Sequence, residues 1–405
     1  MPAAGIITEY DPLHMGHVHL MRETRRLLGP DAAVVCVMSG NYVQRGGFAI
    51  VNKWARAAAA VRSGADLVLE LPVPWALSSA EGFATGAVEL LKATGVVTHL
   101  VFGSESGDAA PLARLAEVLS SDAFPQALRR ELSRGDSFAA ARQRAAGDLL
   151  SPAEAALLSN PNDILGVEYC KALRGSGIRP VAVPRLGSAH GDETAGDGFV
   201  SASAVRALLR KGEEERALSL MAPAMAEAYR AERAAGRAPV LPERCERAML
   251  ARLRFMEEAD FAALDLGREG LYRRFYRASR SAASVEELLE AVKTKRYPMA
   301  RLRRMVFRAY LGLPPAPPGP PPYLRVLAAN ERGGTALLAG MRKTAALPVM
   351  IRPASVRRME PEARSLFDLE ARAGRLYALA YPDPAAAVDE WRTGPAICRE
   401  EDGPK

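Results

Sequence analysis

The sequence predicts an α/β protein in which a parallel sheet is followed by a mainly helical region. Short apolar runs alternate with longer helical patterns over the first half of the chain, which is typical of strand–helix–strand units. The apolar runs are continuous rather than alternating, as expected for strands that are buried on both faces. Beyond about residue 212 the strand signal fades and helical patterns remain.

Five apolar runs are predicted as strands: Ala3–Thr8, Ala32–Met38, Asp66–Leu71, His99–Phe102 and Pro180–Pro184. The predicted helices between them are Gly16–Leu28, Asn52–Ser63, Ser79–Thr94, Ser137–Asp148 and Asp163–Arg174. Later helices are expected at Glu213–Gly236, Pro242–Ala259 and Ser284–Tyr310.

A proline-rich segment divides the second half of the chain. Leu313–Pro322 has the sequence LPPAPPGPPP, which excludes a helix or a central strand and favours an extended spacer over a recruitment motif. We therefore expect an α/β domain over residues 1–212, a helical region over 213–312, a linker over 313–322 and a C-terminal region over 323–405.

Composition limits the function classes. The 405 residues are 49% hydrophobic and 25% charged, which is ordinary for a globular protein. The net charge of +7 permits an anionic partner without requiring one. The four cysteines are scattered singly, so no zinc site or disulfide framework is predicted. No leader or long apolar run is evident, and we expect a cytoplasmic protein without a membrane anchor.

The first candidate site is the segment Gly5–His17, GIITEYDPLHMGH, where a strand turns into a helix. The free N–H groups and positive dipole of a helix start suit a phosphate. His14 and His17 share one face of the opening turn and can donate ring N–H bonds, while Gly16 permits close approach. A metal pair or two capping histidines are the alternatives, although no third metal ligand stands at a useful spacing.

Three further segments could complete such a site. Ser201-x-Ser203-x-x-Arg206 begins a helix and would add a second anion site, although a serine there is usually a cap. Gly103 ends a strand and suits close approach by an adenosine moiety or a plain turn. The loop Ser39–Gly47, SGNYVQRGG, carries a cation near the same sheet edge and is otherwise a solvated loop.

A basic stretch in the helical region could bind nucleic acid. It contains Lys293, Lys295, Arg296, Arg301 and Arg304 around a tyrosine. Cations with an aromatic between them fit a phosphodiester backbone and a stacking base. An ordinary solvated helix face is the alternative.

These motifs together resemble a known family. HxGH and the late SxSxxR are similar to the HxGH nucleotidyltransferase superfamily. Within it, the chain resembles the tRNA(Met) cytidine acetate ligases in the stretches GII-x-EY-x-P-x-H-x-GH, MSGNYVQRG with KWAR, GADLVLELP, FGSESGD, SNPNDILGVEY and KTKRYPMARLRRM. The resemblance covers residues 3 to about 310 and continues more weakly at Tyr323.

The resemblance implies a Rossmann-like ATP-binding domain and a helical tRNA-binding region. Such enzymes convert acetate and ATP to acetyl-adenylate and pyrophosphate, and then acetylate N4 of the wobble cytidine of elongator tRNA(Met). ATP would bring Mg²⁺, and the protein itself would hold no metal. The basic stretch would be part of the tRNA surface. The implied ATP contacts are Ile7, Thr8, Glu9, Tyr10, His14, Gly16, His17, Leu20, Gly103, Asn162, Arg185, Ser201, Ser203 and Arg206, with His14 and His17 catalytic.

The chain departs from the family pattern at three positions. Asp11, Leu13 and Met15 stand where the family usually has Asn, Phe and Asn. An acid beside a triphosphate is unexpected unless magnesium or a hydrogen bond offsets it. Two other functions remain open: a small-molecule adenylyltransferase and a catalytically inactive RNA-binding protein. The sequence does not predict an oligomeric state.

Overall fold

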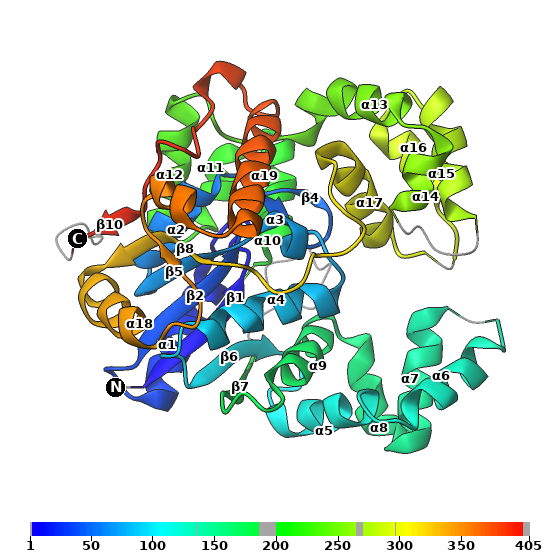
Figure 1. Cartoon of the computed structure of the whole chain (residues 1–405), viewed down its shortest axis with the longest axis horizontal. Helices are drawn as coiled ribbons and strands as arrows, with labels where there is room; N and C mark the ends of the chain where they lie inside the picture. The colour runs from blue at the N-terminus through cyan, green and yellow to red at the C-terminus, as the bar shows by residue number, and fades with distance from the viewer. Residues whose placement is uncertain (1, 136, 186–199, 265–269, 296, 400–405) are drawn as a thin grey trace.

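One mostly parallel sheet organises the chain. The computed structural model describes residues 2–135, 137–185, 200–264, 270–295 and 297–399. The strand order is β10-β8-β5-β2-β1-β6-β7, with β9 beside β8, and helices cover both faces (Figure 1). The strands are β1 Ala3–Thr8, β2 Ala33–Ser39, β5 Leu67–Leu71, β6 His99–Ser104, β7 Arg179–Pro184, β8 Leu324–Asn330, β9 Val349–Met350 and β10 Ala396–Cys398, while β3 Tyr42–Val43 and β4 Gly47–Phe48 form a separate hairpin.

The five predicted strands are confirmed as β1, β2, β5, β6 and β7, and all of their pairings with one another are parallel. Successive side chains enter different cores: Ile7 packs into one apolar cluster and Ile6 into another. Both faces of the sheet are thus buried, which explains the continuous apolar runs. The parallel arrangement places the carboxyl ends of all five strands at one edge.

Helices of the first region pack on this sheet. Five of them match the predictions to within two residues at each end: α1 Met15–Leu28, α2 Lys53–Arg62, α4 Ala80–Ala93, α7 Phe138–Leu149 and α9 Pro161–Leu173. Four further helices in this region were not predicted: α3 Val73–Ala76, α5 Ala109–Leu119, α6 Phe124–Leu132 and α8 Pro152–Ala156. Most of the missed helices lie in the long crossover between β6 and β7.

The second region is helical, as predicted, but its helices are shorter. After α10 Ala202–Arg210, which precedes this region, its helices are α11 Glu214–Ser219, α12 Pro223–Ala234, α13 Glu246–Phe255, α14 Glu258–Ala263, α15 Leu271–Ser281, α16 Val285–Val292 and α17 Met299–Leu311. The predicted helix Ser284–Tyr310 was wrong between α16 and α17, because Pro298 has an extended backbone and caps α17. Part of the basic stretch therefore lies in a connection.

The third core lies where this helical group meets the hairpin and the last helix. Phe307 of α17 packs edge-on against Phe48, with ring centroids 5.0 Å apart. The Tyr42 ring lies 6.1 Å from the Phe307 ring. Tyr377 contacts Phe48 from the other side. The helical group is thus fixed to the loop that follows β2.

Residues after the proline-rich segment return to the sheet. β8 pairs antiparallel with β5, and β10 pairs with β8. No strand was predicted after residue 212, but the described residues form three there. β8 was missed because it contains a charged residue, Arg325, and β9 and β10 were missed because they are very short. The helices here are α18 Leu338–Thr344 and α19 Pro361–Ala378. The predicted domain boundaries remain predictions, but the sheet is built from both ends of the chain.

A buried ionic network joins these two ends. Lys53 Nζ lies 2.7 Å from Glu70 Oε1 and 2.8 Å from Glu390 Oε1. Arg325 pairs with the same two acids, at 3.2 Å from Glu70 Oε2 and 2.6 Å from Glu390 Oε2. Burial and the neighbouring Glu70 raise the pKa of Glu370 to about 8, so this third acid is protonated at neutral pH. Two cations thus balance two anions inside the core.

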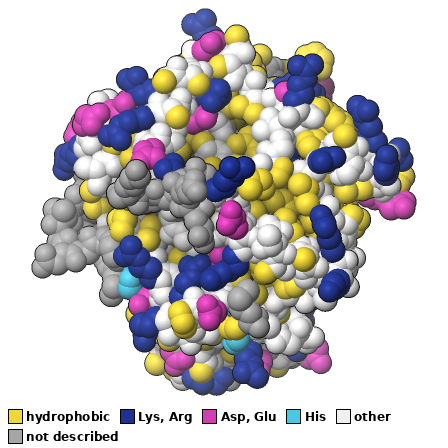
Figure 2. Space-filling model, turned by 90° about the vertical axis from the view of Figure 1, so that its left-hand side faces the viewer, with side chains coloured by type: hydrophobic (Ala, Val, Ile, Leu, Met, Phe, Trp, Pro, Cys, Tyr) yellow, Lys and Arg dark blue, Asp and Glu magenta, His cyan; other side chains and the backbone are white. Residues whose placement is uncertain are grey.

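The described residues contain no helix that is long and apolar enough to span a membrane. Figure 2 shows the side of the molecule on which β10 and α18 lie in Figure 1. On this face Lys and Arg side chains are interspersed with Asp, Glu and apolar side chains, so no single charge dominates it.

Candidate nucleotide site

The candidate site begins at the turn between β1 and α1. β1 ends at Thr8, and Tyr10 has a positive φ of 47°, which turns the chain out of the sheet. The Tyr10 ring is buried, and its hydroxyl lies 3.4 Å from Cys36 Sγ. The Tyr10 and His17 rings make an edge-to-face contact, with their centroids 5.0 Å apart. α1 then begins at Met15, with His14 in extended conformation as the N-cap. The predicted strand, turn and helix start are therefore present.

His14 and His17 form a reciprocal cap. Gly16 N donates to His14 Nδ1 at 3.1 Å, and His14 N donates to His17 Nδ1 at 3.2 Å. The rings lie side by side with centroids 3.8 Å apart. Because both Nδ1 atoms accept, the neutral rings carry their protons on Nε2. The Nδ1 atoms therefore cap the helix, as the capping alternative predicted. The Nε2–H group of each ring remains available to donate to a ligand.

Both histidines are neutral in this structure. Burial, followed by the charge of Arg185, lowers the pKa of His14 to about 4. Burial, then His14 and Arg185, lowers the pKa of His17 well below its ordinary value. The lowered pKa values therefore favour the neutral form of both rings in the free protein. An anion bound beside the Nε2 atoms of the two rings would raise both pKa values, because it offsets the cost of burying the positive charge.

One side of the site is formed by the ends of β6 and β7. Arg185 directly follows β7, and its charge acts on both histidines. Its Nη1 donates to Asn162 Oδ1 at 3.3 Å, at the start of α9. Gly103 is the last residue but one of β6, and a Cβ added there would lie 3.3 Å from Arg185 Cγ. The structure thus brings together three residues that are far apart in sequence.

The other side is formed by α10. Ser201 caps this helix by accepting from Ala204 N at 3.3 Å. Arg206 donates to Ser203 Oγ at 3.2 Å and to the carbonyl oxygen of Asp11, and its Nη1 lies 3.3 Å from Asp11 Oδ2. The predicted hydroxyl–arginine motif therefore reaches the turn before α1, as a clamp would require.

Asp11 is explained by the same contacts. Its buried carboxylate accepts from Ile50 N at 2.6 Å and pairs with Arg206. A hydrogen bond and a cation thus offset its charge, which the sequence alone did not reveal. Leu13 and Met15, the other two departures from the family pattern, pack into the apolar cluster beside Met221 and Ala222.

Glu9 ties the site to the loop after β2. Its Oε1 accepts from Gln44 N at 2.7 Å and from Ser39 Oγ at 3.1 Å. Burial raises the pKa of Glu9, and the bond from Gln44 N opposes that rise. Arg56, which the sequence analysis did not single out, is fully buried and donates to the carbonyl oxygens of Glu9, Ser39, Gly40 and Val51. Arg56 is the arginine of the KWAR stretch, and the resemblance of that stretch to the family could have singled it out.

The remaining predicted nucleotide contacts lie in or near the first strand and helix. Ile7 and Thr8 are buried at the end of β1, and Leu20 packs half-buried on α1. Ile7 and Leu20 offer only apolar surface to the site, whereas Thr8 carries a hydroxyl group. Glu105 was another omission: its carboxylate accepts from Asn162 N and Nδ2 and from Asp163 N, which holds the start of α9.

The basic stretch is divided between exposed and anchored residues. Lys293 and Lys295 are exposed in the connection after α16, and Arg296 lies outside the described residues. Arg301 stacks on Tyr297 at 5.1 Å. Arg304 donates to Gln44 O at 3.2 Å, and a Cβ on Gly46 would collide with the backbone of α17 here. The basic stretch therefore contacts the same loop that binds Glu9.

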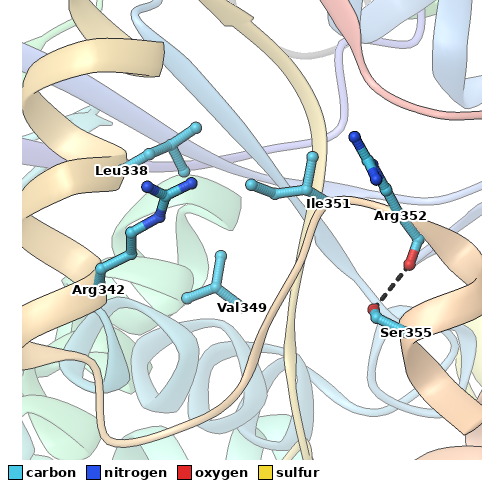
Figure 3. Close-up of a pocket in the computed structure, with 6 residues that line it drawn as sticks. All are labelled: Leu338, Arg342, Val349, Ile351, Arg352 and Ser355. Carbon is cyan, nitrogen blue, oxygen red and sulfur yellow. Dashed lines mark hydrogen bonds between the residues drawn. The ribbon is translucent and has the colours of Figure 1, made fainter. Parts of the chain in front are cut away.

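No metal centre is evident in the described part of the chain, where no group of three or more His, Cys, Asp or Glu is placed to hold an ion. A cavity of about 410 Å³ lies elsewhere, between α18 and residues 349–355 (Figure 3). Arg342 extends from α18 toward Ile351 there, and Ser355 Oγ donates to Arg352 O at 2.7 Å. Its lining includes none of the predicted nucleotide residues.

Comparisons with known proteins agree over nearly the whole chain. The family model HIGH Nucleotidyl Transferase matches residues 1–390. A tRNA(Met) cytidine acetate ligase of Fervidobacterium nodosum is 38% identical over 373 residues, covering 90% of this chain and 87% of that protein. The enzyme of the same name from Acetivibrio thermocellus is 34% identical over 405 residues, covering 95% of this chain and 96% of that protein.

Solved structures agree as well. The crystal structure of apo Thermotoga maritima TmcAL has a TM-score of 0.93 and 34% identity, and the match covers 98% of this chain and 100% of that one. The same protein bound with alpha-thio ATP has a TM-score of 0.91 with the same coverage.

Proposed function

Because the chain belongs to the HIGH nucleotidyl transferases, and within them to the tRNA(Met) cytidine acetate ligase family, we propose that it acetylates a tRNA cytidine at the expense of ATP. Acetate and ATP first give acetyl-adenylate and pyrophosphate. The acetyl group then passes to N4 of the wobble cytidine of elongator tRNA(Met). The observation that carries this proposal is the pair of neutral histidines at the start of α1, flanked by Arg185 and Arg206.

ATP would bind across the carboxyl ends of β1, β6 and β7. The Nε2–H groups of His14 and His17 and the first N–H groups of α1 would face the phosphates. Arg185 and Arg206 would approach from opposite sides, and the adenosine would lie near Gly103 and Asn162. ATP binding by a protein of this fold is supported by the Thermotoga maritima relative, whose structure is bound with alpha-thio ATP.

The first step is an in-line displacement. A carboxylate oxygen of acetate attacks the α-phosphorus, the bond to the β-phosphate bridging oxygen breaks, and pyrophosphate leaves. The chain supplies no covalent nucleophile in this step. Its residues orient the phosphates and stabilise the charge that spreads over the phosphoryl oxygens. Neutral, fixed donors suit this role because they need no reorganisation during the reaction.

Magnesium is proposed to enter with ATP rather than on protein ligands. Asp11, in the turn before α1, already accepts from Ile50 N and pairs with Arg206. The described residues therefore do not fit a protein-held Mg²⁺ ion. When bound to the phosphates, the ion would neutralise part of their charge.

The second step requires the base and the adenylate to meet. Lys293, Lys295, Arg296 and Arg301 are proposed RNA contacts, and Arg304 links them to the loop that binds Glu9. An anticodon loop presents unstacked bases, so N4 of the cytidine is accessible there. The cytidine N4 attacks the acetyl carbonyl carbon, loses a proton, and releases AMP.

The test is incubation of the protein with ATP, labelled acetate and total tRNA, followed by nucleoside analysis. We expect label in N4-acetylcytidine that derives from elongator tRNA(Met). Transfer of AMP to a small molecule, without acetate dependence, would instead indicate a small-molecule adenylyltransferase. A folded protein that binds RNA but not ATP would indicate an inactive relative.

A further inference from the structure

Positive charge is concentrated in one part of the chain. Residues 271–311 contain eleven Lys and Arg against three Glu, an excess of eight, while the whole chain has a net charge of +7. The rest of the protein is therefore almost neutral. Only part of this excess belongs to the basic stretch that the proposed function uses. Four arginines lie on α15, which has no role so far: Arg273, Arg274, Arg277 and Arg280.

α15 is strongly two-sided. Leu271, Phe275 and Ser279 recur at every fourth position and are buried in the helical group. All four arginines are exposed, and Tyr272 and Tyr276 are half-buried between them. We use the name α15 face for Arg273, Arg274, Arg277, Tyr272 and Tyr276.

The arginines differ in how they are occupied. Arg280 donates to the carbonyl oxygens of Arg254 and Met256 and lies over the ring of Tyr276 at 4.3 Å. Arg273 pairs with Glu258 at 3.3 Å. Arg274 and Arg277 form no hydrogen bond or ion pair with other described residues. At a spacing of three they present neighbouring guanidinium groups on one side of the helix.

This chemistry fits the phosphodiester backbone of RNA. Guanidinium groups bind phosphate oxygens through two N–H bonds, and unpaired ones can do so without breaking an existing contact. Tyrosines between cations add a surface for a ribose or base. An acidic protein surface could also form ion pairs with these arginines. RNA is favoured because the α15 face belongs to the same cationic segment as the basic stretch.

The position of α15 indicates which part of an RNA it would reach. In Figure 1 α15 lies on the outer side of the helical group, away from β1 and the start of α1. A base held at the nucleotide site would leave α15 beside a more distant part of the same molecule. In tRNA that part is a helical stem, which proteins recognise by shape and backbone.

We propose that the α15 face is a second RNA contact that binds the backbone of a tRNA stem away from the reacting cytidine. This rests on the proposed function, because the RNA is the tRNA that is acetylated. The face adds affinity through phosphate contacts and takes no part in adenylate formation. It lets the enzyme distinguish a whole tRNA from an isolated anticodon stem–loop.

The test is the double variant Arg274→Glu, Arg277→Glu, compared with Arg342→Glu, Lys343→Glu on α18. Both pairs are exposed, and both variants change the net charge equally. Filter binding with whole tRNA should show a Kd at least about tenfold higher for the α15 variant and less than about twofold higher for the control. A plot of the logarithm of the association constant for tRNA against the logarithm of salt concentration has a negative slope. The magnitude of this slope should be smaller by about two for the α15 variant.

Two further measurements separate this proposal from the proposed function. The isolated anticodon stem–loop should bind the wild type and the α15 variant equally, and acetate-dependent exchange of pyrophosphate into ATP should stay unchanged. If the Glu variant does not fold, Arg274→Gln, Arg277→Gln replaces it, with about half the expected change. Unchanged tRNA binding, or equal weakening by the α18 control, would overturn the α15 proposal. Failure of exchange in the wild type would overturn the proposed function.

Discussion

The nucleotide site and the helical region use polar side chains in opposite ways. At the start of α1, His14, Arg206 and Asp11 are buried or half-buried and bonded to the backbone or to each other. On α15 and around Lys293, most cations are exposed and several have no described partner. A small anion requires a few donors that are already in place. A long polyanion can be bound by many exposed cations, each adding little. The two regions should therefore respond differently to mutation, pH and salt.

The largest expected effect is at His14. Asn in place of His14 retains a cap acceptor but removes the Nε2–H donor. Acetate-dependent exchange of pyrophosphate into ATP should fall by about 10²–10³-fold. tRNA binding and the melting temperature should change little.

The matched control is His14→Gln, which places an amide donor near the Nε2 position and should retain more exchange than the Asn variant. Equal exchange in the Asn variant and the wild type would show that His14 is only a cap.

A large effect on stability is expected in the buried network. Glu390→Gln removes one carboxylate shared by Lys53 and Arg325. Losing one partner of a buried pair should reduce the free energy of unfolding by about 3 kcal/mol, measured by urea denaturation. Asp389→Asn is the control, because its pair with Arg392 is exposed and should contribute less than about 1 kcal/mol. Similar losses in both variants would contradict the balanced charges inferred for the core.

The histidine cap should make stability depend on pH. The folded-state pKa of His14 is about 4, against an ordinary value of 6.5. Between these values the unfolded chain binds a proton that the folded chain excludes, so the contribution is complete above pH 6.5 and lost as pH falls toward 4. Relative to His14→Asn, the wild type should lose roughly 3 kcal/mol from pH 7 to 4. Parallel curves for the two proteins would show that His14 is not held neutral.

A smaller effect is expected at Asp11. Asn at this position can still accept from Ile50 N but removes a negative charge beside the proposed phosphates. The KM for ATP should fall about fivefold, because roughly 1 kcal/mol of repulsion is lost. Steady-state exchange at varied ATP measures it, and tRNA affinity serves as the internal control. A higher KM would mean that Asp11 orients Arg206 for phosphate binding.

The parts of the site that depend on local sequence could be predicted. The strands β1, β2, β5, β6 and β7 were predicted as apolar runs, and the HxGH histidines stand at a recognisable strand–helix junction. Contacts between distant residues could not be predicted. Asp11 and Arg206 are 195 positions apart, and Arg206 reaches the turn only because α10 packs there. The neutral state of the histidines likewise depends on burial, which composition and spacing do not specify.

The late strands show a second reason for failure. β8 contains Arg325, which disrupts the apolar pattern that a buried strand should have. The buried arginine is stabilised because it forms ion pairs with Glu70 and Glu390 inside the core. A charged residue compensated by distant partners is indistinguishable, in sequence, from one that faces water. The proline-rich segment gave no sign that the strands after it, β8 and β10, pair with the sheet that the first half of the chain begins.

One measurement tests most directly the claim that the sheet edge alone forms the adenylate. The protein is incubated with ATP and labelled pyrophosphate, with and without acetate, and in the absence of RNA. The account predicts that label enters ATP only when acetate is present, at a rate that the α15 variant retains and His14→Asn loses. Exchange without acetate, or exchange that requires tRNA, would contradict it.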